Sequence, residues 1–232
     1  MIPLRDINPT RRFSVITLSL VVVNIAAFFY ELSLGAEGTG RFLAAFALVP
    51  RRLFSPETMA PGLIPAAATV ITSMFLHGGA VHLGGNMLYL WIFGNNIEDA
   101  MGRVRFIVFY LLCGSLASFG HAYMHSSSLT PLIGASGAVS GVLGAYVMLY
   151  PRARVVTLVL VGFYARTVEV PALLVLGLWI VLQFLNAVLA GASAGGVAWY
   201  AHIAGFVAGG ALIGLFKRAD VPFGGGRRSH YL

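Results

Sequence analysis

The chain has 232 residues, of which 58% are hydrophobic and only 10% are charged, and its mean hydropathy is +0.85. A soluble domain carries about 45–50% apolar and about 25% charged residues, so this composition excludes a soluble globular protein and predicts an integral membrane protein. The net charge of +7 is typical of basic residues at cytoplasmic helix ends. Because no basic stripe lies on a soluble face, we expect the lipid bilayer as a partner and no nucleic acid.

Six apolar segments predict an all-α fold with six transmembrane helices, since about 20 helical residues cross the hydrocarbon core. The segments are Phe13–Leu34, Leu83–Ile97, Phe106–Met124, Ser136–Tyr150, Val170–Leu189 and Val197–Phe216. They divide the chain into a cytoplasmic N-terminal segment (1–12), a membrane domain (13–216) and a flexible basic cytoplasmic tail (217–232). Residues 35–76 form a long outer loop with four prolines and moderate apolar content, so we expect short helices that pack on the membrane surface.

The distribution of basic residues predicts the orientation of these helices. Twelve of the fifteen Lys and Arg residues fall on one side of the six-helix topology. The other side holds only Arg41, Arg51 and Arg52, all in the long loop. Because positive residues favour the cytoplasmic side, we expect both termini in the cytoplasm and the chain in the cell inner membrane.

Polar side chains within the spans are the candidates for function, because polar groups are costly in lipid. Counting from the cytoplasmic helix ends places His82, Ser136 and His202 in one layer, roughly 22–24 Å from the inner boundary at about 1.5 Å per residue. Three predicted helices therefore bring polar groups to the same depth.

The other histidines and the single cysteine suggest no site. His121, His125 and His230 fall in a loop or in the tail, and we expect them to be solvated. Cys113 is the only cysteine, which excludes an intramolecular disulfide and a cysteine-based metal cage.

Two ladders of small residues predict where the helices of Ser136 and His202 touch. Such ladders let helix backbones approach closely in lipid. They contain Gly137 and Gly141 after Ser136, and Gly205 and Gly209 after His202. A serine beside a neutral histidine is a nucleophile beside its base, so the sequence predicts a Ser136–His202 dyad.

The remaining parts of an acyl-transfer site come from the start of two helices. The nearest carboxylate, Glu169, lies roughly 25–30 Å away by helical rise, which argues for a dyad without a third member. The Ser136 amide opens a helix, and His82 and Asn86 share one helix face, so all three are candidate oxyanion donors. Interhelical hydrogen bonding or metal ligation remains an alternative for His77, His82 and Asn86. The predicted site uses no metal and no cofactor.

The sequence resembles the rhomboid intramembrane serine proteases in three strings: His77-x4-His82-x3-Asn86, Gly134-Ala135-Ser136-Gly137 and Ala201-His202-x2-Gly205-x3-Gly209. The resemblance covers residues 13–216 and fits the compact six-helix prokaryotic form. It implies that Ser136 and His202 are catalytic and that His82, Asn86 and the Ser136 amide line the oxyanion hole. It also implies that single-span membrane proteins are cleaved in or near their spans, after lateral access between the second and fifth helices.

This sequence departs from the family pattern at two places. Some relatives carry a tyrosine four residues after the serine, where it stacks on the histidine, but this chain has Ser140 there. Trp199 and Tyr200 are the candidate replacements. Relatives also often carry Trp-Arg in the first outer loop, and residues 35–76 contain no tryptophan.

Two other functions are alternatives to proteolysis. The polar layer suits a proton or metal-ion transporter, but the spans have no mid-span carboxylate and no internal repeat of the transporter kind. A catalytically silent membrane adaptor is the third possibility, although inactive rhomboid relatives typically lack the serine or the histidine that this chain retains.

Overall fold

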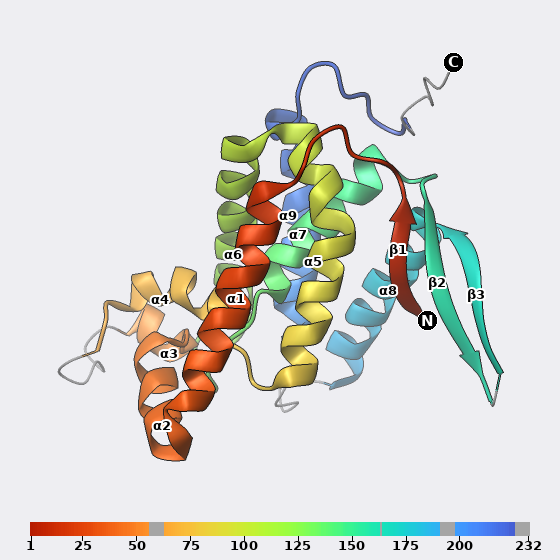
Figure 1. Ribbon diagram of the computed structural model, residues 1–232. Helices are drawn as coiled ribbons and strands as arrows, with labels where there is room; N and C mark the ends of the chain where they lie inside the picture. Colours follow the sequence, from red (N-terminus) through yellow and green to blue (C-terminus); the bar gives the residue numbers. More distant parts are fainter. Residues whose placement is uncertain (56–62, 163, 191–197, 226–232) are drawn as a thin grey trace, which may run out of the picture.

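Long helices form the body of the protein, with a small β-sheet on one side and short helices on the other (Figure 1). The computed structural model describes residues 1–55, 63–162, 164–190 and 198–225. The elements are β1 (Ile2–Ile7), α1 (Val15–Ser33), α2 (Gly35–Phe46), α3 (Pro50–Phe54), α4 (Ala66–Thr72), the 3-10 turn η2 (Ser73–Phe75), α5 (Ala80–Met101), α6 (Arg103–Met124), α7 (Ser136–Leu149), β2 (Arg154–Val161), β3 (Tyr164–Pro171), α8 (Ala172–Ala190) and α9 (Trp199–Phe216).

Each of the six predicted segments coincides with a helix, namely α1, α5, α6, α7, α8 and α9. Among the described residues, four of these helices (α1, α6, α8 and α9) are long and apolar enough to cross a membrane. Helix α5 adds a fifth crossing if it is counted together with α4 and η2 as one span bent by 82°. Helix α7 has 14 residues and is shorter than a full span. The chain is thus a mostly helical multi-pass membrane protein, and six crossings remain a prediction.

Helix α7 lies at the centre of the bundle and contacts α5, α6, α8 and α9. Its backbone touches that of α9: a Cβ atom on Gly205 would lie 2.1 Å from the carbonyl oxygen of Gly137. A Cβ atom on Gly209 would lie 1.9 Å from the carbonyl oxygen of Gly141. No side chain fits at these positions, so the two glycine ladders form the contact between α7 and α9.

A buried carboxylate joins α1 to the end of α5. Glu98 accepts hydrogen bonds from the backbone N–H of Ile16 at 3.0 Å and of Thr17 at 2.8 Å, and from the Thr17 hydroxyl at 2.9 Å. The first N–H groups of a helix have no partner within it, and a negative charge there is favourable. Glu98 therefore caps α1 from a neighbouring helix and fixes the relative height of α1 and α5.

A three-stranded antiparallel sheet, in the order β1-β2-β3, corrects the all-α prediction. Strand β1 comes from the predicted N-terminal segment, while β2 and β3 occupy the predicted connection before α8 and extend to Pro171. Half of the β2 residues are valine, which favours strands. Gly162, which follows the last residue of β2, has a φ of +58° that glycine accommodates without strain.

Asp6 attaches β1 to the bundle. Its Oδ2 atom accepts hydrogen bonds from the Tyr146 hydroxyl and from the Asn96 side chain, both at 2.7 Å. Burial raises the pKa of Asp6 to about 6, because desolvation disfavours the charged carboxylate more than these two donors favour it. The N-terminal strand is therefore held by side chains of α5 and α7 as well as by β2.

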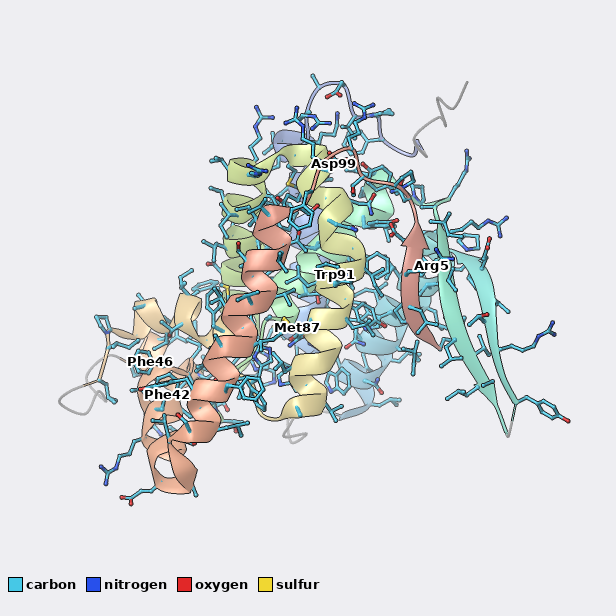
Figure 2. All side chains as sticks on the ribbon, viewed as in Figure 1. Arg5, Phe42, Phe46, Met87, Trp91 and Asp99 are labelled. Atoms are coloured by element: carbon cyan, nitrogen blue, oxygen red, sulfur yellow. The ribbon has the colours of Figure 1, made fainter. Side chains whose placement is uncertain are left out.

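The long loop contains short helices, and the described part of the tail is hydrogen-bonded to the helical bundle. Helix α2 packs on α1 through Phe42, which lies 5.4 Å from Tyr30 and 4.7 Å from Phe46, measured between ring centroids (Figure 2). Within the described part of the tail, the Arg218 amide donates to the Ala100 carbonyl and the Gly224 amide to the Met148 carbonyl. Residues 56–62 of the loop and 226–232 of the predicted flexible tail lie outside the described residues. The docking of the loop on the membrane surface stays a prediction.

We predict that Gly209→Ala destabilises the protein, because the new methyl group must displace the Gly141 backbone. Overpacking of this kind costs about 1–3 kcal/mol, so the thermal unfolding temperature in detergent should fall by several degrees. Gly177→Ala on α8 is the matched control, since nothing lies within 4 Å of a Cβ atom there. Equal unfolding temperatures for the two variants would contradict the close contact between α7 and α9.

Candidate active site

The loop before α7 brings Ser136 to the first position of that helix. Gly134 has a φ of +122°, a conformation that side-chain-bearing residues rarely adopt, and its amide donates to the Ser73 carbonyl at 2.9 Å. Leu132 pairs with Leu48 through two backbone hydrogen bonds. The loop is thus anchored on both sides, and the amide of Ser136 begins the helix without an intrahelical acceptor.

Ser136 and His202 meet at the contact between α7 and α9. The Ser136 Oγ atom lies 2.9 Å from His202 Nε2, within hydrogen-bond distance. On the other side of the ring, His202 Nδ1 lies 2.7 Å from Gln183 Oε1, which comes from α8. Three helices therefore contribute one continuous chain of hydrogen bonds.

This series of hydrogen bonds determines which nitrogen of His202 carries the proton. The Gln183 Nε2 atom donates to the Trp179 carbonyl at 3.4 Å, so its Oε1 atom faces His202. An amide oxygen only accepts, so His202 Nδ1 is the donor. The lone pair of neutral His202 is then on Nε2, which accepts a hydrogen bond from the Ser136 hydroxyl. This arrangement suits a general base, and an amide takes the orienting place that a carboxylate has in a triad.

Two tryptophans flank the His202 ring. The Trp179 ring on α8 lies 5.8 Å from it, tilted by 37°, and the Trp199 ring lies 6.3 Å from it, nearly perpendicular. Tyr200, the other candidate for this place, instead contacts His125 at 5.2 Å. At the family's tyrosine position, the Ser140 hydroxyl donates to the Ser136 carbonyl at 2.6 Å. The aromatic cover of His202 therefore comes from Trp199, one of the two candidates from the sequence, and from Trp179 on α8, which the sequence did not indicate.

His82 and Asn86 lie against the loop that leads into Ser136. A Cβ atom on Gly134 would lie 2.7 Å from the His82 ring and 3.7 Å from Asn86 Nδ2. The buried Asn86 amide is hydrogen-bonded to His77 Nε2 at 3.1 Å. Because the amide has two hydrogens, one can bind His77 while the other remains for a ligand. His77 thus orients Asn86, in agreement with the hydrogen-bonding alternative that the sequence left open for these residues.

These groups line a cavity of about 990 Å³ whose walls include Ser136, His202, His82 and Asn86. The same cavity corrects the prediction that His121 and His125 are solvated. Both half-buried rings line it, stacked on each other with centroids 4.5 Å apart. Helix α6 ends at Met124 as predicted, so His121 lies in its last turn, and the prediction of solvation failed because α9 packs against this end through Tyr200.

Gln183 is the main residue of the site that sequence reasoning missed. The one signal was a polar side chain within an otherwise apolar span, on the same helix as Asn186. Nothing in the spacing along the chain relates Gln183 to His202, since the faces on which α8 and α9 meet are set by tertiary packing.

Comparison with known proteins agrees with the three sequence strings. The sequence profile of the Rhomboid domain matches residues 66–219, which contain every residue of the candidate site. Similar curated proteins include Rhomboid protein 1, mitochondrial, of Saccharomyces cerevisiae, which is 35% identical over 41% of this chain and 29% of its own length. They also include Rhomboid protease GluP of Bacillus subtilis, 42% identical over 36% of this chain and 16% of its own length. Rhomboid protease AarA of Providencia stuartii is 29% identical over 62% of this chain and 55% of its own length. The chain thus spans at most about half the length of these relatives.

We predict that Gln183→Leu loosens the orientation of His202, because leucine fills a similar volume but accepts no hydrogen bond. The fraction of His202 protonated on Nδ1 should fall, as measured by ¹⁵N chemical shifts of histidine-labelled protein. Asn186→Leu, three residues along α8, is the matched control and should leave the His202 spectrum unchanged. An unchanged spectrum in Gln183→Leu would mean that Gln183 does not hold this ring.

Proposed function

The chain belongs to the rhomboid family, and we propose that it is a serine endopeptidase that cleaves peptide bonds in or near the transmembrane segments of other membrane proteins. The observation that carries the proposal is the Ser136–His202 hydrogen bond of 2.9 Å. It is supported by Gln183, which leaves the Nε2 lone pair facing the serine. The names of the two bacterial relatives, both rhomboid proteases, point to the same chemistry.

In the proposed mechanism His202 acts first as a base and then as an acid. His202 Nε2 takes the Ser136 proton while Ser136 Oγ attacks the peptide carbonyl carbon. The imidazolium then gives that proton to the departing amine as the C–N bond breaks, which leaves an acyl ester on Ser136. Water, deprotonated by His202, attacks the ester and releases the new carboxyl terminus and Ser136.

The negative charge on the carbonyl oxygen requires donors that are already in place. We assign this role to the Ser136 amide at the start of α7, to His82 and to the second amide hydrogen of Asn86. All three belong to the cavity wall or to the turn beside Gly134. Because Asn86 is fixed by His77, its donor needs little rearrangement when the charge forms.

Access for water follows from the short central helix. The 14 residues of α7 extend about 21 Å, less than the roughly 30 Å hydrocarbon core, so the loop before Ser136 lies below the membrane surface. Irregular backbone at that depth needs protein partners or a wet cavity, and this loop has both in Ser73, Leu48 and the adjoining cavity. We therefore propose that the cavity admits water to the dyad.

We further propose six crossings, with α5 preceded by a bent half-span and α7 completed by its loop. The basic residues at one end of the bundle support cytoplasmic termini and a location in the cell inner membrane. Substrate segments then reach the cavity between α5 and α8, where Tyr89 and Trp179 face each other with ring centroids 6.4 Å apart.

We predict that Ser136→Ala and His202→Ala each abolish cleavage of a single-span substrate without unfolding the protein. The double variant should be no worse than either single one, because the pair acts as a unit. Labelling by a fluorophosphonate in detergent should require Ser136. The matched control is Ser115→Ala on α6, whose hydroxyl donates to a backbone carbonyl and which does not line the cavity. Substantial turnover by Ser136→Ala would refute Ser136 as the nucleophile, whereas a wild type without cleavage and without Ser136-dependent labelling would favour a transporter or a silent adaptor.

We predict a graded loss for the oxyanion donors. Removal of one such donor costs about 10²–10³ in kcat in a soluble serine protease, and Asn86→Ala should lose less because the other two donors remain. Fluorophosphonate labelling of Ser136 should continue, although more slowly. His82→Ala should behave similarly, and the double variant should be worse than either single variant. The measurement is kcat and KM on a model substrate, where an unchanged kcat with a raised KM would show that Asn86 only binds substrate.

A further inference from the structure

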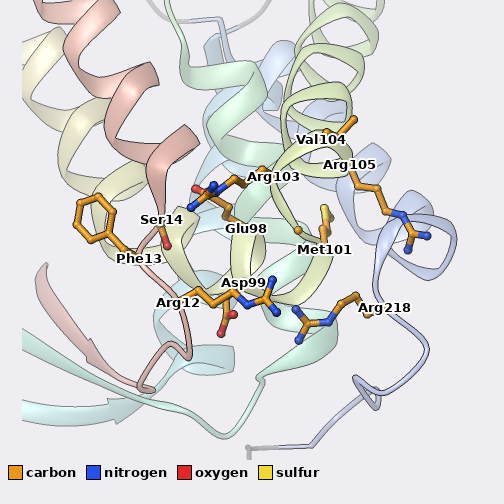
Figure 3. Close-up of a pocket in the computed structure, with 11 residues that line it drawn as sticks. Arg12, Phe13, Ser14, Glu98, Asp99, Met101, Arg103, Val104, Arg105 and Arg218 are labelled. Atoms are coloured by element: carbon orange, nitrogen blue, oxygen red, sulfur yellow. The ribbon is translucent and has the colours of Figure 1, made fainter.

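Figure 3 shows a second cavity, of about 550 Å³, with the residues that line it. Met101 at the end of α5 lines this cavity, while His82 in the first turn of the same helix lines the cavity beside Ser136. The two cavities therefore lie at opposite ends of α5. The wall of this cavity comes from the residues before α1, the last turn of α5, the first turn of α6 and Arg218 after α9. It is therefore separate from the proposed active site.

Arginine dominates the charge of this cavity. Arg12, Arg103, Arg105 and Arg218 line it, against two carboxylates, Glu98 and Asp99. Glu98 is already engaged by three donors from the start of α1, and Asp99 accepts the Arg11 amide at 2.8 Å. The two carboxylates thus accept hydrogen bonds from backbone N–H groups before and at the start of α1. With four arginines against two carboxylates, the cavity keeps an excess of positive charge.

Much of the donor capacity of the arginines is unused. Arg105 Nη1 reaches the Lys217 carbonyl only at 3.4 Å, and Arg218 Nε binds Asp220 at 3.2 Å. Within the described ranges, no acceptor is hydrogen-bonded to the exposed side chains of Arg12 and Arg103. A guanidinium offers five N–H groups in a fork that matches phosphate oxygens. The cavity is therefore built for an anion with several oxygen acceptors.

Apolar side chains continue from the rim of the cavity into the membrane region. Phe13 is 68% exposed and Val104 is 76% exposed, and both line the cavity. Val108 and Leu112 follow Val104 at four-residue intervals, so exposed apolar groups form a stripe along one face of α6. A ligand that fits both features has an anionic head and a hydrocarbon tail.

We propose that this cavity binds the phosphate headgroup of an anionic phospholipid, with an acyl chain along the Val104 stripe of α6. Basic pockets between membrane helices favour such headgroups, and each arginine near the surface adds to the affinity. Inorganic phosphate shares the head chemistry but lacks the tail, so the stripe on α6 selects the lipid.

The test is native mass spectrometry of the full chain released from detergent, titrated with dioleoyl-phosphatidylglycerol, dioleoyl-phosphatidylcholine or inorganic phosphate. We expect phosphatidylglycerol to bind more tightly than phosphatidylcholine, and inorganic phosphate to compete weakly. The variant R12Q/R103Q should bind phosphatidylglycerol about 25-fold more weakly, at about five-fold for each arginine. The matched control R152Q/R166Q removes the same charge from residues that do not line the cavity, and it should bind like the wild type.

Three results would overturn the proposal. If both double variants bind phosphatidylglycerol equally weakly, the lipid responds only to general surface charge. The other two results are equal affinity for phosphatidylglycerol and phosphatidylcholine, and full competition by inorganic phosphate, which would indicate a site for a free anion. Thermal unfolding in lipid-free detergent checks that R12Q/R103Q folds. If that variant is unstable, V104Q replaces it, because a polar residue on the stripe should weaken lipid binding and leave phosphate competition unchanged.

Discussion

The direct contact between the backbones of α7 and α9 is the constraint on which the rest of the structure depends. Gly205, one turn after His202, touches the carbonyl of Gly137, the residue directly after Ser136. No side chain therefore separates the two helices at that level. The 2.9 Å approach of Ser136 to His202 is then a result of helix packing. A pair positioned by rigid elements is more precise than one positioned by loops.

Helix α8 adds a second constraint from outside this contact. Gln183 fixes the proton of His202 on Nδ1, and Trp179 covers the same ring. Most of the α8 surface is nevertheless exposed to the surroundings of the bundle, unlike α7, which lies at its centre. If substrate reaches the cavity beside α8, as proposed, movement of that helix would change the hydrogen bond that prepares the base. Under the proposed function, one amide side chain would thus link the access route to the chemistry.

The two ends of the bundle handle polar groups differently. Near Ser136, uncharged donors and acceptors surround a cavity, because a charge would be costly at that depth. At the opposite end, ionisable side chains are frequent: Glu98 caps α1, Asp6 attaches β1, and arginines surround the second cavity. Water and lipid headgroups can solvate charges there, so the same end both fastens the helices and offers positive charge to the membrane surface.

The sequence by itself determined the membrane class, the positions of the long helices, the family and the candidate pair, because hydropathy and small-residue spacing are local properties. It could not provide the sheet, since β1 is short and pairs with a strand from the other half of the chain. Nor could it assign Gln183, Trp179, His121 and His125 to the site, because those assignments depend on which helix faces meet. The tertiary structure decided these points through packing between segments distant in sequence, where the energy of a polar group depends on the partner that the fold brings to it.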